Sequence, residues 1–363
     1  MNILFISCLS NSLSTGPAWS VPARIDAQSK LDDVLWVNLS NACHDHWKQI
    51  PAYHNISEYK SVSLKSLPKP FNHPDVVVFE GFYGGLKEIR IALDCWRFKV
   101  PYIIVPRGSL TWQAMHNHSK MKKELAHFFF YDKFVKNALA IQYLTEKEYE
   151  DSKYRFRGKH FILPNGYTIP NIQKSQFSEK GINACFIGRI DIYHKGLDVL
   201  IDAIYSIQDY LRNNQFHITI YGPTSHDYNQ VKLMIAEKGL DDLACMGGEV
   251  LGEIKRDVLL SSDVFVLTSR FEGHPMGLLE ALAYGVPCFV TPGVNMRDEV
   301  DEFDAGWTSE LNISDMSSTI RHLIEEKESL LVKGNNARKL AVNYSWDIIA
   351  KNMHDNIKEY GIK

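Results

Sequence analysis

Two glutamates in the C-terminal half have the type and spacing of residues that bind hydroxyl groups. Glu272 and Glu280 lie, with seven residues between them, in the stretch RFEGHPMGLLEALAYGVPCFVTPG. The first follows the apolar run DVFVLTS, which predicts a strand, and the second lies in a predicted helix whose first turn suits Pro275. They are either solvated surface acids or carboxylates that bind the hydroxyls of a sugar nucleotide.

The start of this predicted helix adds an anion-binding element. Backbone N–H groups from about His274 to Gly277 have no partner within the helix, and the helix dipole adds partial positive charge there. Gly273 and Gly277 allow a ligand to approach the backbone closely. Hydroxyl-binding groups at two ends, with an anion-binding element between them, match the layout of a nucleoside diphosphate sugar.

Two cations that follow an earlier apolar run complete the set. In FIGRIDIYHKG, Arg189 lies at the tip of a predicted strand and Lys195 at the start of the next helix. Arginine offers a planar pair of donors to phosphate oxygens, and lysine offers a compact charge. Together they could neutralise the charge that builds on a departing diphosphate, where sugar transfer most needs stabilisation.

Apolar runs alternate with helical segments along the whole chain, which predicts parallel sheets covered on both faces. About eleven such runs, among them NILFIS and FHITIYGP, are too many for one comfortable sheet, and the polar segment after Leu163 marks a connection. We predict an α/β chain of two doubly wound domains, residues 1–166 and 167–343, and a final helix over 344–363. In such sheets ligands bind at the carboxyl ends of the strands, where the residues named above lie.

The composition is that of an ordinary globular enzyme. A net charge of -3, with 40 Lys+Arg against 43 Asp+Glu, gives no reason to expect nucleic acid as a partner. The 6 cysteines are scattered without metal-ligand spacing, which indicates reduced thiols. No run approaches the roughly 20 apolar residues that span a bilayer, and MNILFIS resembles a buried strand more than a signal peptide. We therefore expect a cytoplasmic protein without a metal site.

These motifs resemble those of a known family. The segment from Gly188 to Gly196, followed by Glu272 and Glu280, resembles the second domain of the retaining glycosyltransferases of the GT4 group. The resemblance is specific across 163–293 and weaker in the N-terminal half. It implies a GT-B fold, with two Rossmann-like domains facing a central cleft and the last helix returning to the first domain. It also implies that the second domain binds the donor, that the first binds the acceptor, and that no cofactor or metal is obligatory.

The resemblance implies a role for each matching residue. Glu272, Arg189 and Lys195 would form the catalytic set, in which Glu272 orients the donor sugar and the two cations bind the diphosphate. Glu280 would bind the ribose hydroxyls. Pro275 contributes no backbone donor, and the ring of His274 is expected to face solvent. Further substrate-binding positions are expected in loops of both domains: Gly188, Val250, His274, Pro275, Met276 and Gly277 in the second, and Thr15, Gly16, Arg107 and Asn165 in the first.

Features of the first domain leave alternatives open. Arg107 stands where many relatives have a histidine; it cannot act as a base, so it either binds an anion of the donor or acceptor or forms a structural salt bridge. The first loop, STGPAW, lacks a double glycine, which weakens its expected phosphate contact. Glu80 is either a site residue at a strand tip or a buried, hydrogen-bonded acid. His116 and His118 are acceptor-side candidates or simple loop residues.

The segment SKMKKELAHFFFYDKFVKNALA brackets an aromatic cluster, Phe128 to Tyr131, with lysines. One interpretation is an amphipathic helix whose apolar face lies in the core of the first domain. The other is peripheral attachment to anionic lipid on the inner face of the plasma membrane, which suits an enzyme with a lipid-linked acceptor.

The function that we expect is retaining transfer of a sugar from a UDP- or GDP-sugar to a hydroxyl of a glycan or lipid-linked acceptor. Bacterial surface polysaccharide assembly, of O-antigen, capsule or exopolysaccharide, is the pathway that the resemblance favours. Two rivals stay open: a nucleotide-sugar 2-epimerase of the same fold, and a non-catalytic sugar-nucleotide-binding subunit. The complete set of Arg189, Lys195, Glu272 and Glu280 argues against the second rival. The motifs do not reveal which base, sugar or acceptor the protein binds, and they do not reveal its oligomeric state.

Overall fold

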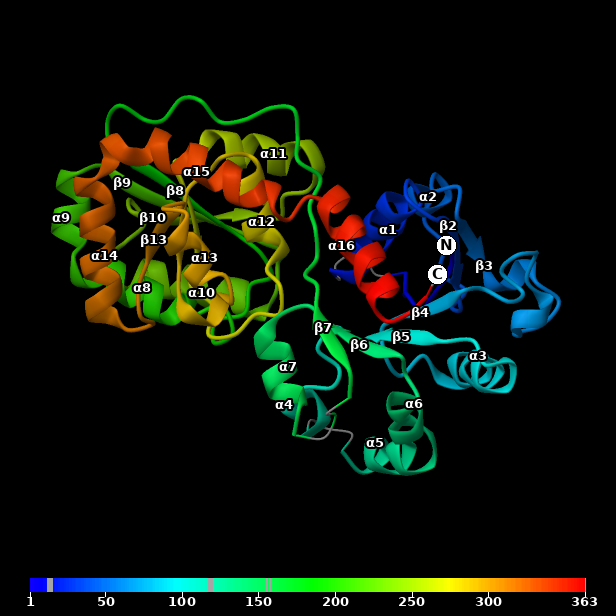
Figure 1. The fold of residues 1–363 in the computed structure, drawn as a ribbon. Coiled ribbons are helices and arrows are strands. Elements are labelled where there is room, and N and C mark those ends of the chain that lie inside the picture. Colours follow the sequence, from blue (N-terminus) through cyan, green and yellow to red (C-terminus); the bar gives the residue numbers. More distant parts are fainter. Residues whose placement is uncertain (12–15, 117–119, 155, 157, 363) are drawn as a thin grey trace. The chain divides into compact units, whose positions relative to one another are not determined.

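The computed structural model describes residues 1–11, 16–116, 120–154, 156 and 158–362. The chain forms two compact units (Figure 1). The N-terminal unit comprises Met1–Gly166 together with Trp346–Lys363, and the C-terminal unit comprises Tyr167–Ser345. Each unit has its own parallel sheet and its own core.

The N-terminal unit is built on a seven-stranded parallel sheet in the order β3-β2-β1-β4-β5-β6-β7. Its central strands are apolar on both faces because two separate cores cover them. The strands are β1 (Asn2–Ser7), β2 (Asp33–Asn38), β3 (Tyr53–Asn55), β4 (Val76–Glu80), β5 (Tyr102–Val105), β6 (Ala140–Tyr143) and β7 (His160–Ile162).

Helices cover both faces of this sheet. Helices α1 (Pro17–Gln28) and α16 (Trp346–Glu359) pack side by side and contribute to one core (Figure 1). Helices α3 (Gly85–Phe98) and α6 (Asp132–Lys136) contribute to the other. The remaining helical segments are α2 (Asp45–Lys48), α4 (Trp112–His116), α5 (Lys120–Ala126), the π-helical turn η3 (His127–Tyr131) and α7 (Glu146–Ser152), with the 3-10 turns η1 (Ile56–Glu58) and η2 (Leu64–Ser66).

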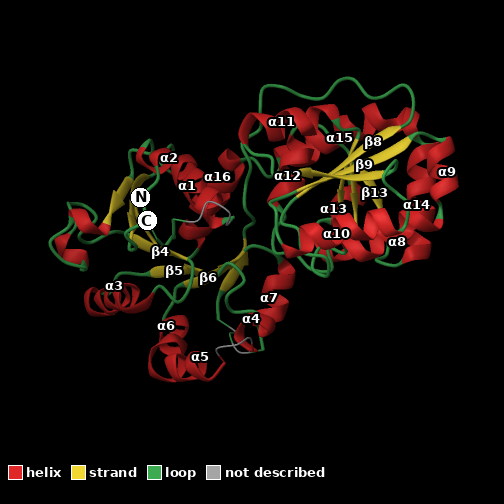
Figure 2. Cartoon of the chain, turned by 180° about the vertical axis from the view of Figure 1, so that it is seen from behind, coloured by secondary structure: helices red, strands yellow, loops and turns green. Residues whose placement is uncertain are grey.

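The C-terminal unit repeats this plan with a six-stranded parallel sheet in the order β10-β9-β8-β11-β12-β13, with helices on both faces (Figure 2). The strands are β8 (Ile182–Ile187), β9 (Phe216–Tyr221), β10 (Ala244–Gly248), β11 (Val264–Leu267), β12 (Cys288–Val290) and β13 (Gly306–Thr308). The helices are α8 (Leu197–Ser206), α9 (Gln208–Asn213), α10 (His226–Glu237), α11 (Gly252–Ser261), α12 (Met276–Ala283), α13 (Arg297–Glu302), α14 (Ile313–Glu325) and α15 (Leu330–Val342), with the 3-10 turns η4 (Pro292–Val294) and η5 (Lys327–Ser329).

In both sheets the strand order reverses once. The reversal lies between β1 and β4 in the N-terminal unit and between β8 and β11 in the C-terminal unit. Loops that leave the carboxyl ends of two such strands diverge to opposite faces and leave room for a ligand between them. The prediction of two doubly wound parallel sheets is confirmed, and the motif residues of the C-terminal half fall at its reversal point.

Glu80, at the end of β4, is completely buried between two guanidinium groups. Its Oε1 lies 2.9 Å from Nη1 of Arg24, and its Oε2 lies 2.7 Å from Nη2 of Arg107. Burial by itself would raise the pKa of Glu80, but the charges of the two arginines outweigh it and the pKa is lowered. Of the two interpretations of Glu80, the structure therefore supports the buried, hydrogen-bonded acid.

Glu88, in the first turn of α3, is a second buried acid near the end of β4. Its Oε2 accepts hydrogen bonds from the Gly84 N–H at 2.8 Å and from the Tyr131 hydroxyl at 3.2 Å. Burial outweighs these bonds and raises the pKa of Glu88 to about 7. The folded protein therefore holds the proton of Glu88 at a pH at which the unfolded chain has lost it.

This difference predicts a pH dependence of stability. Below about pH 4.5 both states are protonated at Glu88, and the stability associated with this group is fully present. Between about pH 4.5 and about pH 7 the unfolded chain loses the proton first, so the free energy of unfolding falls, by roughly 3 kcal/mol in total. Glu88→Gln should remove this fall and should melt at a higher temperature than the wild type at pH 7.5.

Melting temperatures of the two proteins between pH 5 and pH 7.5 check this expectation. Glu146→Gln, in the exposed first turn of α7, is the matched control and should keep the wild-type pH dependence. The same slope with pH in Glu88→Gln as in the wild type would show that Glu88 does not carry the effect.

Candidate active site

Lys195 and Glu272 form an ion pair at the carboxyl edge of the C-terminal sheet, beside the reversal point. The Lys195 Nζ contacts Oε1 of Glu272, and each side chain is only 12% exposed. The hydroxyl of the buried Ser269 donates to the same Oε1 at 2.6 Å. The loops after β8 and β11 thus present one cation and one carboxylate side by side, although 77 residues separate them in the chain.

The two loops are held together by backbone and side-chain hydrogen bonds. The N–H of Arg270 donates to the carbonyl of His194 at 2.8 Å, and the hydroxyl of Thr268 donates to the carbonyl of Lys195 at 2.9 Å. Gly196 has a φ of +63°, and a Cβ at this position would lie 2.2 Å from the carbonyl oxygen of Thr268. The close approach of the loops therefore requires glycine at position 196.

Arg189 is the most exposed of the predicted cations, with a side chain 67% exposed. Its Nη2 lies 2.9 Å from Nδ1 of His194 and 3.5 Å from Oδ2 of Asp191. The ring of His194 in turn stacks on Phe271, the residue before Glu272, at 4.2 Å. Arg189 therefore reaches the Glu272 loop through His194, which the sequence analysis did not single out.

The start of α12 has the open backbone expected of an anion site. Pro275 is the N-cap, with φ -80° and ψ 93°, and no side-chain hydrogen bond caps the helix. The N–H groups of Leu278 and Leu279 bond back to the carbonyl of Pro275, so Met276 and Gly277, both partly buried, form the first turn. This geometry agrees with the predicted cradle of backbone donors.

The prediction that the ring of His274 faces solvent is wrong. Its Nδ1 is buried and lacks a hydrogen-bond partner among the described residues, and its ring packs against Tyr344 with a centroid distance of 5.4 Å. Burial lowers the pKa of His274 to about 3, so the ring is neutral at physiological pH. The packing against Tyr344 turns the ring inward.

Glu280 does not pair with the predicted cations but with Lys255 of α11, whose Nζ contacts its Oε2. Burial raises the pKa of Tyr167, and the negative charge of Glu280 raises it further. Val250, the position predicted to frame the base, is buried and lies just before α11. Sequence reasoning missed Lys255 although it lies in the same segment, GGEVLGEIK, because nothing in the linear order links it to Glu280.

The residues predicted in the N-terminal unit have structural roles or lie outside the described residues. Arg107 donates to Glu80, to Ser20 at 3.1 Å and to Asn165 at 3.2 Å, and it is nearly buried. The geometry thus supports a structural salt bridge for Arg107, with Asn165 as its acceptor. Gly16 is the N-cap of α1 and its carbonyl accepts the first helical bonds. Thr15 and His118 lie outside the described residues.

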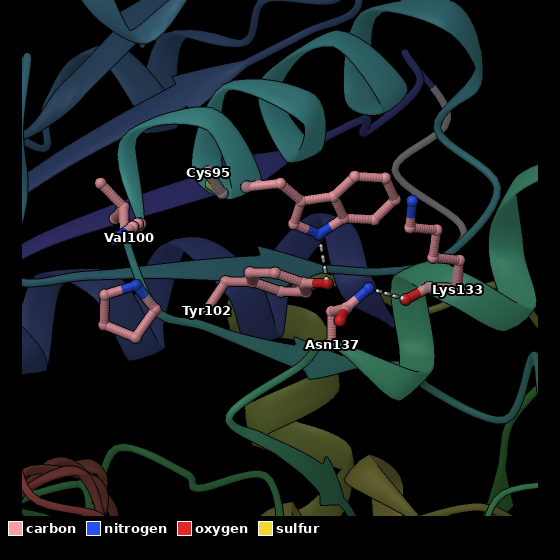
Figure 3. Close-up of a pocket in the computed structure, with 8 residues that line it drawn as sticks. Cys95, Val100, Tyr102, Lys133 and Asn137 are labelled. Carbon is pink, nitrogen blue, oxygen red and sulfur yellow. Dashed lines mark hydrogen bonds between the residues drawn. The ribbon is translucent and has the colours of Figure 1, made fainter.

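A separate cavity of about 390 Å³ lies at the amino end of β5, at the edge of the N-terminal sheet opposite the strand tips (Figure 3). Among its lining residues, the indole N–H of Trp96 donates to the hydroxyl of Tyr102 at 2.9 Å, and the side-chain amide of Asn137 donates to the carbonyl of Lys133. It contains no predicted site residue and no carboxylate. The lining residues are Cys95, Trp96, Lys99, Val100, Pro101, Tyr102, Lys133 and Asn137.

The aromatic segment agrees in part with each of its two interpretations. His127 and Tyr131 are buried, and Phe134 belongs to the core. Phe128 and Phe129, in contrast, are 80% and 77% exposed. Among the described residues no helix is both long enough and apolar enough to cross a bilayer.

Comparison with known proteins finds a family model that is similar to the C-terminal unit. Residues 169–340 match the family model described as glycosyl transferases group 1. A capsular polysaccharide biosynthesis glycosyltransferase, CapH of Staphylococcus aureus, is 31% identical over 185 residues, which are 50% of this chain and 50% of that protein. An N,N'-diacetylbacillosaminyl-diphospho-undecaprenol alpha-1,3-N-acetylgalactosaminyltransferase of Campylobacter jejuni is 32% identical over 96 residues, 26% of each chain. The matches thus span half or less of the length of these relatives.

Among solved structures, Anabaena Alr3699/HepE in complex with UDP superimposes with a TM-score of 0.74 at 14% identity. The match covers 99% of this chain and 100% of that one, which shows a common fold over both units. The candidate site residues Arg189, Lys195, Lys255, Glu272 and Glu280 lie in the part that the family model matches. Residues 169–340 are thus similar to a glycosyl transferases group 1 domain, and both units of the chain share the GT-B fold of the glycosyltransferase structures.

Proposed function

We propose that this chain transfers a sugar, with retention of its anomeric configuration, from a nucleoside diphosphate sugar to a hydroxyl of a glycan or lipid-linked acceptor. The observation that carries the proposal is the Lys195–Glu272 ion pair beside the open first turn of α12. This ion pair places a lysine that can bind phosphate beside a glutamate that can bind hydroxyl groups, in a segment that matches the group 1 glycosyltransferase model.

In the proposed reaction the bond between the anomeric carbon and the phosphate oxygen breaks while the acceptor oxygen bonds to the same face of that carbon. The acceptor hydroxyl gives its proton to the departing phosphate oxygen, so the atoms and charges balance without a protein base. Lys195, Arg189 and the backbone donors at Met276 and Gly277 stabilise the charge on the diphosphate. Glu272 orients the sugar by accepting hydrogen bonds from its hydroxyls.

The ion pairs support this division of roles. Glu272 uses Oε1 for both Lys195 and Ser269, so binding of a diphosphate can draw the ammonium group toward phosphate while Ser269 keeps the carboxylate in place. Glu280 contacts Lys255 through Oε2, and a carboxylate has acceptor positions on both oxygens. We assign ribose hydroxyls to Glu280 and the base to the segment at Val250. No metal is required in this scheme.

Two of the relatives support our choice of donor and acceptor classes. The Anabaena structure contains UDP, and the relative from Campylobacter jejuni acts, by its name, on a sugar linked through a diphosphate to undecaprenol. We therefore favour a UDP-sugar over a GDP-sugar, and a lipid-linked acceptor of surface polysaccharide synthesis. The exposed Phe128 and Phe129, with the exposed Lys133 and Lys136 nearby, suit peripheral contact with the cytoplasmic face of an anionic membrane.

A thermal-shift screen against UDP, GDP, ADP and their sugars tests the proposal first. A ligand that binds the folded state raises the melting temperature according to its concentration and affinity, and we expect UDP and one UDP-sugar to give the largest rise. Incubation of that sugar nucleotide with and without acceptors then separates transfer from epimerisation. Proton NMR of the product should show the anomeric configuration of the donor, with transfer undiminished by a chelator. An epimer formed without acceptor would favour the epimerase, and binding without any turnover would favour the binding subunit.

Substitution of Lys195 should reduce turnover far more than it reduces stability. Lys195→Met removes a charge that stabilises the leaving diphosphate, and loss of one such group typically lowers kcat by about 10²–10³-fold. The rise in melting temperature with UDP should also shrink. Lys238→Met is the matched control, because Lys238 forms an ion pair of its own, with Asp202 at 3.0 Å, outside the proposed site. Equal turnover in Lys195→Met and Lys238→Met would contradict the assigned role.

Membrane contact has a separate test. In flotation with vesicles of phosphatidylglycerol, the double variant Phe128→Ser/Phe129→Ser should remain with the unbound protein while the wild type floats. Lys133→Gln/Lys136→Gln should weaken flotation and make it less sensitive to salt. Leu233→Ser, which changes an exposed apolar residue of α10, should float as the wild type does. Unchanged flotation of both double variants would show that this segment is not the contact.

A further inference from the structure

His194 joins Arg189 to the loop that carries Glu272, through both nitrogens of its ring. Its Nδ1 lies 2.9 Å from Nη2 of Arg189, and its Nε2 lies 2.5 Å from the carbonyl oxygen of Phe271. Its ring also stacks on that of Phe271, with the two planes inclined by 16°. The backbone N–H of His194 donates to Oδ1 of Asp191 at 2.9 Å, so the residue is held by its backbone as well as by its ring.

The chemistry of the two partners determines which ring nitrogen carries the proton. A carbonyl oxygen only accepts, so Nε2 of His194 carries the proton and donates it to Phe271. A guanidinium group only donates, so Nδ1 presents its lone pair to Arg189. Both hydrogen bonds therefore require a neutral imidazole in a single tautomer.

The groups around the ring favour this neutral form. Burial lowers the pKa of His194, and the positive charges of Lys195 and Arg189 lower it further. The carboxylate of Glu272 and the bond to the Phe271 carbonyl act in the opposite direction, but the net shift is downward. The ring is therefore neutral at physiological pH, as its two hydrogen bonds require.

Arg189 depends on His194 for its orientation. The arginine side chain is 67% exposed, and its other contact among the described residues is with Oδ2 of Asp191, at 3.5 Å. An exposed arginine loses side-chain entropy when a ligand fixes it in one conformation. The bond to Nδ1 of His194 reduces this loss because it holds Nη2 in place. The Nε and Nη1 donors of Arg189 have no partner among the described residues, and they can bind phosphate oxygens.

We propose that His194 is a positioning residue for the diphosphate of the donor, and that its Nδ1 holds the guanidinium of Arg189 in the orientation that binds phosphate. This role rests on the proposed function, in which Arg189 binds the diphosphate. His194 lies within the segment from Gly188 to Gly196, but the resemblance assigned no role to it. If His194 only supported the Glu272 loop, its loss would affect binding of the donor sugar and would leave binding of the diphosphate unchanged.

His194→Gln and His194→Asn separate the two hydrogen bonds of the ring. The amide of glutamine can replace Nε2 and donate to Phe271, whereas the amide oxygen of asparagine can replace Nδ1 and accept from Arg189. We expect His194→Gln to weaken binding of UDP about 3- to 10-fold, the effect of one hydrogen bond. His194→Asn should recover most of this loss. Binding of uridine, which has no phosphate, should be the same in both variants as in the wild type. Titration calorimetry with UDP, and competition by uridine, measure these affinities.

A second measurement shows whether the effect passes through Arg189. Arg189→Met alone should weaken UDP binding about 10- to 100-fold, because hydrogen bonds between charged groups are lost. Addition of His194→Gln to Arg189→Met should cause no further loss, since both changes act through one guanidinium group. The control is His217→Gln in β9, a histidine whose Nδ1 lies 3.3 Å from the carbonyl oxygen of Asp242, and it should bind UDP as the wild type does.

Three results would overturn the positioning role of His194 alone. They are an unchanged affinity for UDP in His194→Gln, equal losses in His194→Gln and His194→Asn, and losses that multiply when His194→Gln is combined with Arg189→Met. A wild type that binds neither UDP nor another nucleoside diphosphate would overturn the proposed function, and the role of His194 with it.

Discussion

The carbonyl of Thr268 occupies the place that a side chain at position 196 would need, and the arrangement of the candidate active site depends on this contact. Because residue 196 is glycine, the loop after β8 can lie directly against the loop after β11. The adjacent Lys195 then contacts Glu272. A second ion pair, between Nη2 of Arg270 and Oδ2 of Asp198 at 2.7 Å, also holds the two segments together. Strands that are neighbours in the sheet but distant in sequence thus deliver both groups to one point.

Each acid of the E-x7-E pair has a lysine partner. Glu272 pairs with Lys195 and Glu280 with Lys255, and all four side chains are largely buried. A buried carboxylate without a partner would be costly, so the lysines compensate the charge of the two acids. A ligand that brings both hydroxyls and a diphosphate supplies new partners to both signs of charge, whereas a simple anion or a simple sugar supplies only one. This is a physical reason for selecting a nucleoside diphosphate sugar.

Sequence alone predicted the two doubly wound sheets because their central strands are continuous apolar runs. It missed β3 and β13, which are three-residue strands at the outer ends of the two sheets and have no such run. At the site, the order of Arg189, Lys195 and Glu272 relative to the strands was enough to predict that they lie at one edge. The partners Lys255 and His194, and the inward ring of His274, depend on packing between segments that the linear order does not link.

A crystal structure of the protein with UDP would show where the diphosphate binds. We expect the diphosphate to lie within hydrogen-bonding distance of Lys195 and of the backbone N–H groups of Met276 and Gly277, with the ribose against Glu280. A diphosphate bound elsewhere, for example between Lys99 and Lys133 in the cavity at the amino end of β5, would contradict it.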